Sequence, residues 1–411
     1  MKAKSVHLND AGPGDVGALS KRAAPTRIAR TAELRTQPIR VLTAVPICDG
    51  HDSAINTINL EFIRCGIEVV YLGYHRSARD IVRAAIQEDA HAIGISSYNG
   101  GHSEFFAEVV DLLKRQGADD IGVFGGGGGT ITKADAAIMQ KKGVDRIFFA
   151  GTPLSEMVKF VKNTFGAHRR LGLRARGKTA SGSDRQIAKM LTAAESGDAE
   201  DEAYCRGAPA KGNGPTTIGI TGPGGVGKTT LIDELVLRFL KADPQTRLAI
   251  LSHDPSLIGH GALLGDRATM IYSQDDRVFM RSLATRGQAG GLSPASGRCL
   301  QLLKGGGFDF VFVETVGIGQ EAAPFGRQWV DNVILVMSPE YGSRLQLQKI
   351  VMLDVADIVV LNKSDLSGAK TAAAEIEQRL ALNGEGQKLV STVARRHRDA
   401  GVHELFRLAM S

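Results

Sequence analysis

The stretch GPGGVGKT, residues 222–229, decides the fold of the second half of this chain. It has the spacing G-x-x-x-x-G-K-T of the loop that holds the phosphates of a nucleoside triphosphate. The apolar residues 216–220 ahead of it predict a buried strand, and residues 231–237 behind it predict a helix. In this context, backbone N–H groups and the positive end of the helix bind phosphate. The sequence therefore predicts an α/β domain with a nucleotide site.

The chemistry of this loop predicts individual roles for its residues. Lys228 reaches the β- and γ-phosphates and contributes to catalysis, and the hydroxyl of Thr229 binds Mg²⁺. The predicted nucleotide contacts are Gly222, Gly224, Gly225, Val226, Gly227, Lys228, Thr229 and Thr230.

Three carboxylates are predicted to complete this site, because hydrolysis also needs Mg²⁺ ligands and a group that organises the attacking water. Asp254 and Glu314 each stand at the end of an apolar, strand-like run. Asp266 lies in a glycine-bearing loop, and residues 264–267 of this loop are a candidate switch segment. We predict all three as magnesium ligands, and we place Glu314 and Asp266 beside Lys228 in the catalytic set.

The motif N-K-x-D at residues 362–365 predicts a site for the base. The carboxylate of Asp365 can accept hydrogen bonds from both N1–H and the 2-amino group of guanine, and adenine has no matching pair of donors. The stem of Lys363 can pack over the base, and Asn362 completes the motif. Ser391 is predicted to close the base pocket. These residues favour GTP over ATP.

The first half of the chain alternates predicted strands and helices from residue 40 to residue 165. Strict alternation indicates a parallel sheet covered on both faces, with ligands beyond the C-terminal ends of the strands. We therefore predict two doubly wound α/β domains: a flavodoxin-like domain over residues 40–165 and a P-loop GTPase domain over residues 215–411. Residues 166–214 are predicted to be a linker with a helix at 183–194, and residues 1–39 a disordered basic tail. The predicted strands are 40–45, 68–72, 92–96, 121–124 and 146–149, then 216–220, 247–252, 308–313, 332–337 and 357–361.

Charge and composition argue against several classes of function. The formal charge of +6 is concentrated at the start, where residues 1–40 hold eight Lys or Arg against three acids. The remaining body is near neutral, so we expect no nucleic-acid partner. Four scattered cysteines without a CxxC pair argue against a zinc site and a disulfide framework. The apolar runs are too short to span a membrane and no secretory signal is evident, so we expect a cytoplasmic protein.

Loops of the predicted first domain carry a second set of chemically informative residues. His51 follows Asp49 by two positions on a loop that opens a predicted helix. One imidazole nitrogen can then face a metal while the carboxylate holds the other nitrogen and fixes the tautomer. The five glycines at 125–129 let the backbone approach a bulky group closely. A lone His near an Asp is usually only a helix-capping neighbour. A flavodoxin-like domain that holds no such group is the alternative for the fold.

Together with SSYNGGH at residues 96–102, these motifs resemble the cobalamin-binding domain of adenosylcobalamin-dependent acyl-CoA mutases, above all isobutyryl-CoA mutase of the fused type. The resemblance implies that His51 replaces the nucleotide-tail base as the lower cobalt ligand, with Asp49 as its hydrogen-bond partner. Ala54 stands where many members have glycine, which leaves slightly less room. The resemblance further implies that the slot for the displaced tail is lined by Ser97, Gly125, Gly126, Gly127 and Gly128.

The second half of the chain resembles the MeaB-like GTPase chaperones of cobalamin mutases. DPS at residues 254–256, LLGDR at 263–267 and ETVGIGQ at 314–320 carry this resemblance. The two resemblances imply adenosylcobalamin, GTP or GDP, and Mg²⁺ as cofactors. They imply a GTPase that gates the loading of intact cofactor and the removal of damaged cofactor. Residues 256–261 and 288–291 depart from the usual switch-loop sequences, which leaves the timing of the switch open.

Partners are also implied by the resemblance. A fused mutase continues into a (β/α)₈ barrel that binds the acyl-CoA, and these 411 residues leave no room for one. We therefore expect a cobalamin-binding subunit joined to its GTPase chaperone, which acts as an acyl-CoA mutase only with a separate barrel subunit. A piece of a longer fused enzyme and a corrinoid carrier for methyl transfer are the alternatives. Further expectations are an adenosyltransferase that delivers cobalamin and homo-oligomerisation through the GTPase domain.

Overall fold

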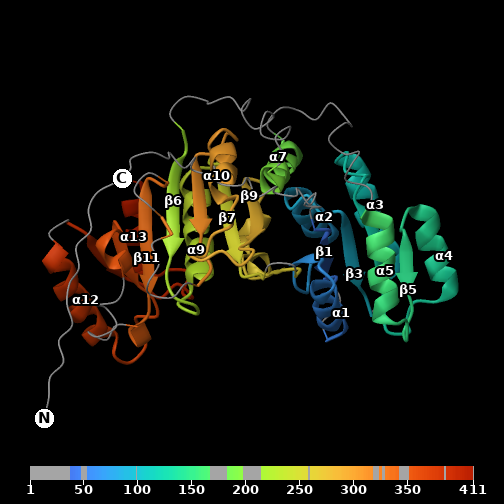
Figure 1. Ribbon diagram of the computed structural model, residues 1–411, viewed down its shortest axis with the longest axis horizontal. Coiled ribbons are helices and arrows are strands. Elements are labelled where there is room, and N and C mark those ends of the chain that lie inside the picture. Colours follow the sequence, from blue (N-terminus) through green and yellow to red (C-terminus); the bar gives the residue numbers. More distant parts are fainter. Residues whose placement is uncertain are drawn as a thin grey trace, which may run out of the picture. The chain divides into compact units, whose positions relative to one another are not determined.

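The computed structural model describes residues 38–47, 53–98, 100–166, 183–197, 214–257, 260–317, 324–325, 329–341, 351–383 and 386–410. Nearly all of the predicted basic tail and most of the predicted linker lie outside these residues. Within the described part, the chain forms two parallel sheets, each with helices on both faces (Figure 1). The predicted fold class is confirmed.

The first sheet contains the five strands predicted for the first domain. Core residues of α1 and α5 pack on one face, and those of α2, α3 and α4 pack on the other. Capping boxes begin two of these helices: Ser77 with Asp80, and Thr132 with Asp135. The strands are β1 (Arg40–Ala44), β2 (Glu68–Tyr71), β3 (Ala92–Ser96), β4 (Gly122–Gly126) and β5 (Arg146–Phe148), and the helices are α1 (Ser53–Arg64), α2 (Ala78–Gln87), α3 (His102–Arg115), α4 (Lys133–Lys142) and α5 (Leu154–Phe165).

A sixth strand of this sheet comes from the second half of the chain. Strand β8 (Leu263–Leu264) pairs in parallel with β2, with Val69 opposite Leu263 and Val70 opposite Leu264. The strand order is β5-β4-β3-β1-β2-β8. The predicted switch segment 264–267 therefore begins on the edge of the first sheet. A strand of two residues has no periodicity, so the sequence does not reveal it.

The second sheet has the order β13-β12-β11-β6-β10-β7-β9, and all its pairings are parallel. The five strands predicted for this domain are present, and β9 and β13 add to them. Its strands are β6 (Thr216–Thr221), β7 (Leu248–Asp254), β9 (Val278–Ala284), β10 (Phe310–Glu314), β11 (Asn332–Met337), β12 (Ile358–Leu361) and β13 (Lys388–Ser391).

Helices again cover both faces of the second sheet. Helices α9 (Lys228–Ala242) and α13 (Ala400–Met410) pack on one face. Helices α10 (Ser296–Lys304), α12 (Ala369–Asn383) and α7 (Asp184–Ser196) pack on the other. Helix α7 is the predicted linker helix, and its apolar residues belong to the core of the second sheet. Short 3₁₀ helices are η1 (Asp266–Ala268), η2 (Tyr272–Gln274), η3 (Pro339–Tyr341) and η4 (Val351–Asp354).

Strand order places a ligand crevice in each sheet. In the first sheet, β1 has β2 on one side and β3 on the other, so the strand order reverses at β1. In the second sheet, β6 has β10 on one side and β11 on the other, so the strand order reverses at β6. In doubly wound sheets, ligands bind at the C-terminal ends of the strands beside such a reversal. The loop after β1 leads to the predicted cobalt ligand, and the loop after β6 is the glycine loop of residues 222–229.

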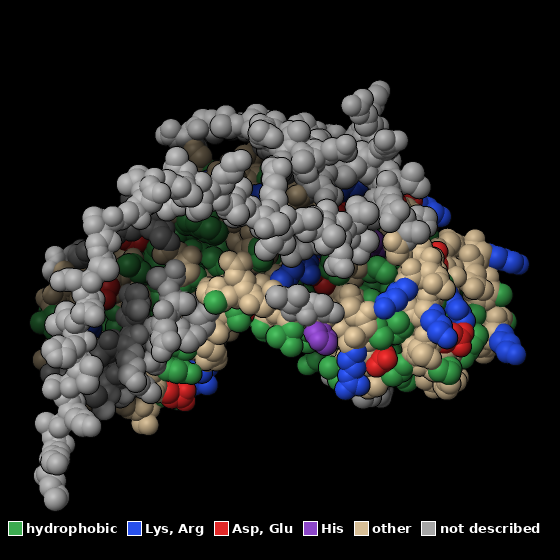
Figure 2. Space-filling view, viewed as in Figure 1, with side chains coloured by type: hydrophobic (Ala, Val, Ile, Leu, Met, Phe, Trp, Pro, Cys, Tyr) green, Lys and Arg blue, Asp and Glu red, His purple; other side chains and the backbone are tan. Residues whose placement is uncertain are grey.

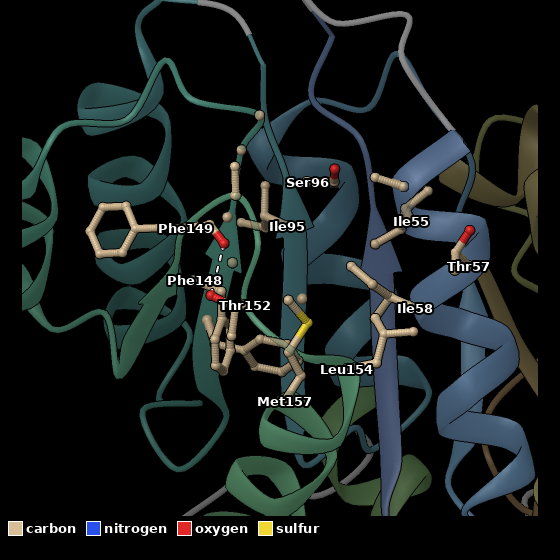
Figure 3. A pocket seen from close by; sticks show the side chains of 18 of the residues that line it. Ile55, Thr57, Ile58, Ile95, Ser96, Phe148, Phe149, Thr152, Leu154 and Met157 are labelled. Carbon is tan, nitrogen blue, oxygen red and sulfur yellow. Dashed lines mark hydrogen bonds between the residues drawn. The ribbon is translucent and has the colours of Figure 1, made fainter.

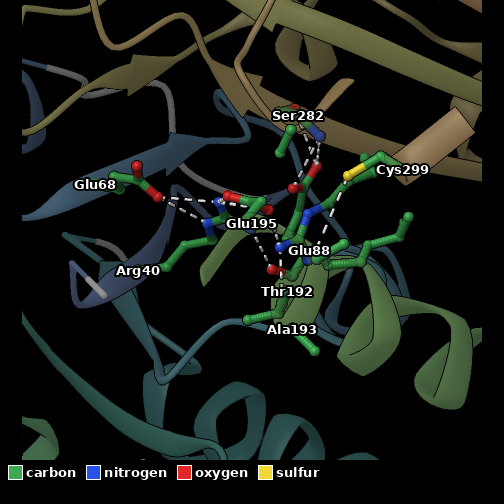
Figure 4. Close-up of polar contacts among 12 residues, drawn as sticks. Arg40, Glu68, Glu88, Thr192, Ala193, Glu195, Ser282 and Cys299 are labelled. Atoms are coloured by element: carbon green, nitrogen blue, oxygen red, sulfur yellow. Dashed lines mark hydrogen bonds and ion pairs between the residues drawn. The ribbon is translucent and has the colours of Figure 1, made fainter. Parts of the chain in front are cut away.

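Buried charges join β1, β2, α7 and the β9 region (Figure 4). Arg40 forms ion pairs of 2.9 Å with both Glu68 and Glu195. Glu195 also pairs with Arg281 of β9, whose side chain is fully buried. Positive and negative side chains therefore alternate from Glu68 through Arg40 and Glu195 to Arg281. Each buried charge has a partner of opposite sign, which offsets the cost of its burial.

A depressed pKa at Glu195 makes this network sensitive to acid. Burial alone would raise the pKa of its carboxyl, but Arg40 and Arg281 outweigh burial and hold the pKa at about 2, below the ordinary 4.5. The folded state therefore favours the ionised carboxyl, and this contribution to stability is complete above pH 4.5 and disappears as the pH falls towards 2. We expect Glu195→Gln to lower the free energy of unfolding most at pH 7 and progressively less below pH 4.5, as measured by urea denaturation.

The matched control for this prediction is Glu377→Gln, at an exposed position on α12. It should leave the free energy of unfolding close to that of the parent at every pH. A deficit of Glu195→Gln that is independent of pH would contradict the ion-pair assignment.

Figure 2 shows one face of the molecule, on which the Lys and Arg side chains of the described residues are interspersed with Asp and Glu. Among the described residues, no helix has the length and apolar character needed to cross a membrane.

Candidate functional sites

A cavity of about 440 Å³ opens at the C-terminal edge of the first sheet. Strands β1, β3 and β4 form one wall, and the start of α1 and of α5 forms the opposite wall (Figure 3). Ile55, Ile58, Phe148 and Met157 give it a mostly apolar lining, and Ser96 adds a hydroxyl. Its position beside the reversal of strand order is where a bound group is expected in this fold.

Glycines 125–128 lie on this cavity, and close packing explains why they have no side chain. A Cβ at Gly127 would lie 1.8 Å from the carbonyl oxygen of Ser97, and a Cβ at Gly128 would lie 1.9 Å from the ring of Tyr98. A Cβ at Gly125 would lie 2.3 Å from the carbonyl oxygen of Ile95. The run therefore brings β4 against its neighbours and leaves backbone as the wall of the cavity.

Ser96, the residue before the predicted Ser97, lines the cavity. Ser97 follows the last residue of β3, and its side chain is buried. The backbone N–H of Ser97 donates to the carbonyl of Gly126 at 2.9 Å. The predicted role of Ser97 in holding the nucleotide tail stays a prediction. Asp49 and His51 lie outside the described residues, so their roles stay predictions.

The glycine loop between β6 and α9 has the backbone that phosphate binding requires. Gly222, Gly225 and Gly227 have φ of 144°, 74° and 91°, which side chains rarely adopt. A Cβ at Gly222 would lie 2.1 Å from the carbonyl oxygen of Val336. Lys228 Nζ donates to the carbonyls of residues 222 and 223, at 3.0 Å each. The ammonium is therefore held within the loop, next to where phosphates would bind.

Three predicted carboxylates converge beside this loop, because the parallel strands β7 and β10 end at the same edge. Thr229 Oγ1 donates to Glu314 Oε1 at 2.7 Å. Ser252 Oγ lies between Asp266, to which it hydrogen bonds, and Glu314 Oε2 at 3.4 Å. Asp254 accepts from the N–H of residue 265 at 3.2 Å, which ties it to the start of η1.

The electrostatics of this cluster suit a bound cation. Burial, and then the charge of Asp266, raises the pKa of Glu314 to about 8. Burial also raises the pKa of Asp254 and of Asp266, and burial lowers the pKa of Lys228. A divalent cation would relieve the repulsion among these carboxylates. Within the described residues, no three His, Cys, Asp or Glu side chains are grouped so that they could hold a metal ion by themselves.

Asn362 of the predicted base site connects three loops. Its Nδ2 donates to the carbonyl of Val226 at 2.9 Å, and its Oδ1 accepts from Thr392 Oγ1 at 3.1 Å and from the N–H of Ala394 at 3.0 Å. Lys363 follows with φ of 58°. This conformation is rare for a residue with a Cβ and marks a tight turn that presents the base-reading residues.

Three further residues predicted to contact the nucleotide are Asp365, Ser391 and Thr230. Asp365 forms ion pairs with Arg395 and Arg396, the second at 3.7 Å. Ser391 ends β13, and the side chain of the next residue, Thr392, is the one that reaches Asn362. The side chain of Thr230 is exposed.

Sequence reasoning missed several residues of this site. Ser252 lies between two carboxylates, but a serine two positions before a strand-end acid carries no motif of its own. Arg395 and Ala394 lie in the loop after β13, a strand that was not predicted. Only the pairing of β13 with β12 brings that loop to the base site.

The fold and the two sites define a class of protein: a P-loop GTPase domain joined to a flavodoxin-like domain with an apolar cavity. The family model described as methylmalonyl-CoA mutase-associated GTPase MeaB matches residues 187–407, and that of the B12 binding domain matches residues 39–158. The first match covers more than half of the chain, so the chain belongs to the MeaB GTPase family. It joins a B12-binding domain to a GTPase domain of that family.

Relatives in several organisms share both halves. The fused isobutyryl-CoA mutase of Cupriavidus metallidurans is 37% identical over 95% of this chain, and that of Geobacillus kaustophilus is 36% identical over 90%. The chain spans 37% and 36% of the length of these two proteins. A protein named as a GTPase in Pyrococcus abyssi is 38% identical over 55% of this chain and 71% of its own length.

Proposed function

We propose that this chain binds cobalamin in its first domain and GTP with Mg²⁺ in its second, and that GTP hydrolysis gates the loading of intact cofactor and the removal of damaged cofactor. His51 would hold the cobalt, Asp49 would orient its imidazole, and the apolar cavity would take the nucleotide tail. When bound, adenosylcobalamin supplies the radical chemistry of an acyl-CoA isomerisation. The proposal is supported by a cavity with a mostly apolar wall and by the cluster of Asp254, Asp266 and Glu314, in which burial raises the pKa of each carboxyl.

One observation supports the link between the two activities: the segment that carries Asp266 begins as an edge strand of the first sheet and leads to the carboxylates at the edge of the second sheet. Residues 263–264 pair with β2 of the first sheet, and Asp266 follows two residues later beside Ser252 and Glu314. The carbonyl of Ala268 accepts from Arg76, in the loop after β2. Contacts of a γ-phosphate and its Mg²⁺ order switch loops, and hydrolysis releases them. A shift of Asp266 would therefore pull on the edge strand of the cobalamin-binding sheet.

The isomerisation itself is proposed to require a substrate-binding barrel. The relatives named fused isobutyryl-CoA mutases are almost three times the length that this chain covers. We propose that a barrel, on a separate chain or on a further part of a longer enzyme, binds the acyl-CoA. An adenosyltransferase would deliver the cofactor, and the GTPase domain would form a homo-oligomer. The chain of 411 residues alone should bind cobalamin and hydrolyse GTP without isomerising an acyl-CoA.

His51→Ala tests the cobalt ligand. Cobalamin bound to this variant should lose the absorbance and paramagnetic resonance signature of imidazole-ligated cobalt, because no other side chain is proposed to coordinate the metal. Electron paramagnetic resonance of the Co(II) form, with ¹⁵N-labelled histidine, provides the measurement. A cobalt signal identical to that of the parent would contradict the assignment.

Two matched measurements make this test specific. GTP hydrolysis in the absence of corrinoid should match that of the parent and would show that the variant is folded. His403→Ala, on α13 far along the chain from the first domain, should retain the imidazole-ligated spectrum.

A further inference from the structure

A buried histidine, His253, lies near the end of β7, directly before Asp254 of the nucleotide site. Its Nδ1 lies 2.7 Å from the carbonyl oxygen of Glu314, and its Nε2 lies 2.6 Å from the hydroxyl of Ser296. The carbonyl can only accept a hydrogen bond, so Nδ1 carries a proton. Burying an imidazole is costly unless its nitrogens are paired, and here both are. The ring therefore joins the ends of β7 and β10 to the first residue of α10.

Two consecutive residues of β7 contact Glu314 from opposite faces of the second sheet. Ser252 Oγ lies 3.4 Å from the carboxylate of Glu314, on the face where Ile250 packs with the core residues of α9. His253 contacts the carbonyl of Glu314 from the other face, where Leu251 packs with the core residues of α10. Successive side chains of a strand alternate between the two faces. One residue thus contacts the carboxylate, and the next holds the main chain that carries it.

The stretch after this carboxylate is held by the loop that leads to α10. The backbone N–H of Val316 donates to the carbonyl of Gly291 in that loop at 3.0 Å. Gly317 follows, and a Cβ at this glycine would lie 2.5 Å from the Cα of Gly224 in the phosphate loop. The hydrogen bonds of His253 and Gly291 therefore fix a short stretch of chain that begins at the magnesium site and ends against the phosphate loop.

We propose that His253 is a positioning residue for GTP hydrolysis, which acts through the main chain of Glu314 to hold the carboxylate proposed to bind magnesium. The proposal rests on the proposed function, in which the second domain hydrolyses GTP with Mg²⁺. The side chain of His253 lies on the face of the sheet opposite to α9, so it acts through Glu314 and not on the nucleotide. A misplacement of about 1 Å can cost roughly 10²-fold in rate. Loss of one positioning contact should cost less, roughly tenfold in kcat.

The test compares His253→Leu and His253→Asn in GTP hydrolysis. Leucine cannot hydrogen bond to either partner, so kcat at saturating GTP and Mg²⁺ should fall roughly tenfold. The Mg²⁺ concentration for half-maximal rate should rise roughly tenfold, while the KM for GTP changes less than threefold, because the phosphate loop and the base site stay intact. The amide of asparagine can place an N–H near the position of Nδ1, and this variant should retain at least a third of the parental kcat.

Two outcomes would contradict the proposal in different ways. A parental kcat and Mg²⁺ requirement in His253→Leu would overturn the role of His253 while the GTPase activity stands. A parent chain that does not hydrolyse GTP would overturn it together with the proposed function.

Leu303→Ala and Ser296→Ala separate positioning from a loss of stability. Leu303 is fully buried on α10 in the core on the His253 face, so its truncation should lower the midpoint of urea unfolding and leave kcat within about twofold of the parent. An equal loss of kcat in Leu303→Ala and His253→Leu would overturn the proposal, because destabilisation would then explain both. Ser296→Ala removes one partner of the ring and keeps the test decisive if His253→Leu does not fold. It should lower kcat roughly threefold or more, and a parental kcat would overturn the proposal.

Discussion

Lys228→Ala is expected to lower kcat for GTP hydrolysis by roughly 10²- to 10³-fold, the loss typical when a positioned donor to developing charge is removed. In the structure, its ammonium donates to the carbonyls of residues 222 and 223. Burial lowers its pKa, while Glu314 and Asp266 oppose that shift. Phosphate oxygens would replace these carbonyls as acceptors and would bring the charge onto the γ-phosphate. Phosphate release at saturating GTP provides the measurement.

Lys241→Ala is the matched control for this loss. Lys241 lies in the last turn of the same helix, α9, and its side chain is exposed. Its substitution removes an equal charge from the same element and should leave kcat within about twofold of the parent, since an exposed charge acts weakly at that distance. A Lys228→Ala protein that folds, binds GTP and retains a third or more of the parental kcat would contradict the role of this lysine.

The nucleotide site was largely predictable because its chemistry restricts residue types. A lysine after a glycine loop is typical of a phosphate site, and acids at strand ends are typical of a magnesium site. Lys228, Asp254 and Glu314 meet because the C-terminal ends of parallel strands share one edge. Ser252 was not predictable, because many residues at a strand end could donate to a carboxylate.

The contacts between the first sheet and the second half of the chain could not be predicted, for a different reason. Glu88 and Arg267 are separated by 179 positions in the sequence, and neither stands in a pattern that names the other. Strand β8 is too short to show alternation. Ser96 ends β3 and lines the cavity, and the sequence alone does not show which of two adjacent serines ends the strand.

Arg267→Met is expected to lower the free energy of unfolding by about 3–5 kcal/mol, the usual cost of leaving one member of a buried ion pair uncompensated. The guanidinium is fully buried, and its Nε donates to Glu88 Oε1 at 3.1 Å. It also donates to Gln87 Oε1 at 3.2 Å and to the carbonyl of Met280. Methionine fills part of the volume, and among the described residues it leaves the carboxylate of Glu88 with hydrogen bonds from the N–H and hydroxyl of Ser282. Chemical denaturation followed by circular dichroism provides the measurement.

A double-mutant cycle separates the ion pair from packing. Adding Glu88→Gln to Arg267→Met removes the orphaned charge, so the double variant should recover more than 1 kcal/mol relative to the sum of the single losses. Arg79→Met is the matched control, because Arg79 on α2 pairs with Asp276, just before β9, and both side chains are exposed. That loss should stay below about 1 kcal/mol. Additive losses in the cycle would contradict a pairwise ionic coupling.

Arg267→Met also tests whether the buried pair of Arg267 and Glu88 positions Asp266, the neighbour of Arg267. If the buried pair fixes η1, Arg267→Met should reduce GTP hydrolysis under conditions where the protein remains folded, whereas Arg79→Met should not. Both arginines pair across the same two parts of the chain, and they differ in burial and in distance along the chain from Asp266. A loss of hydrolysis confined to Arg267→Met would therefore show that the anchoring of η1 by Arg267, and not contact between the two parts in general, positions Asp266, the carboxylate proposed to bind magnesium.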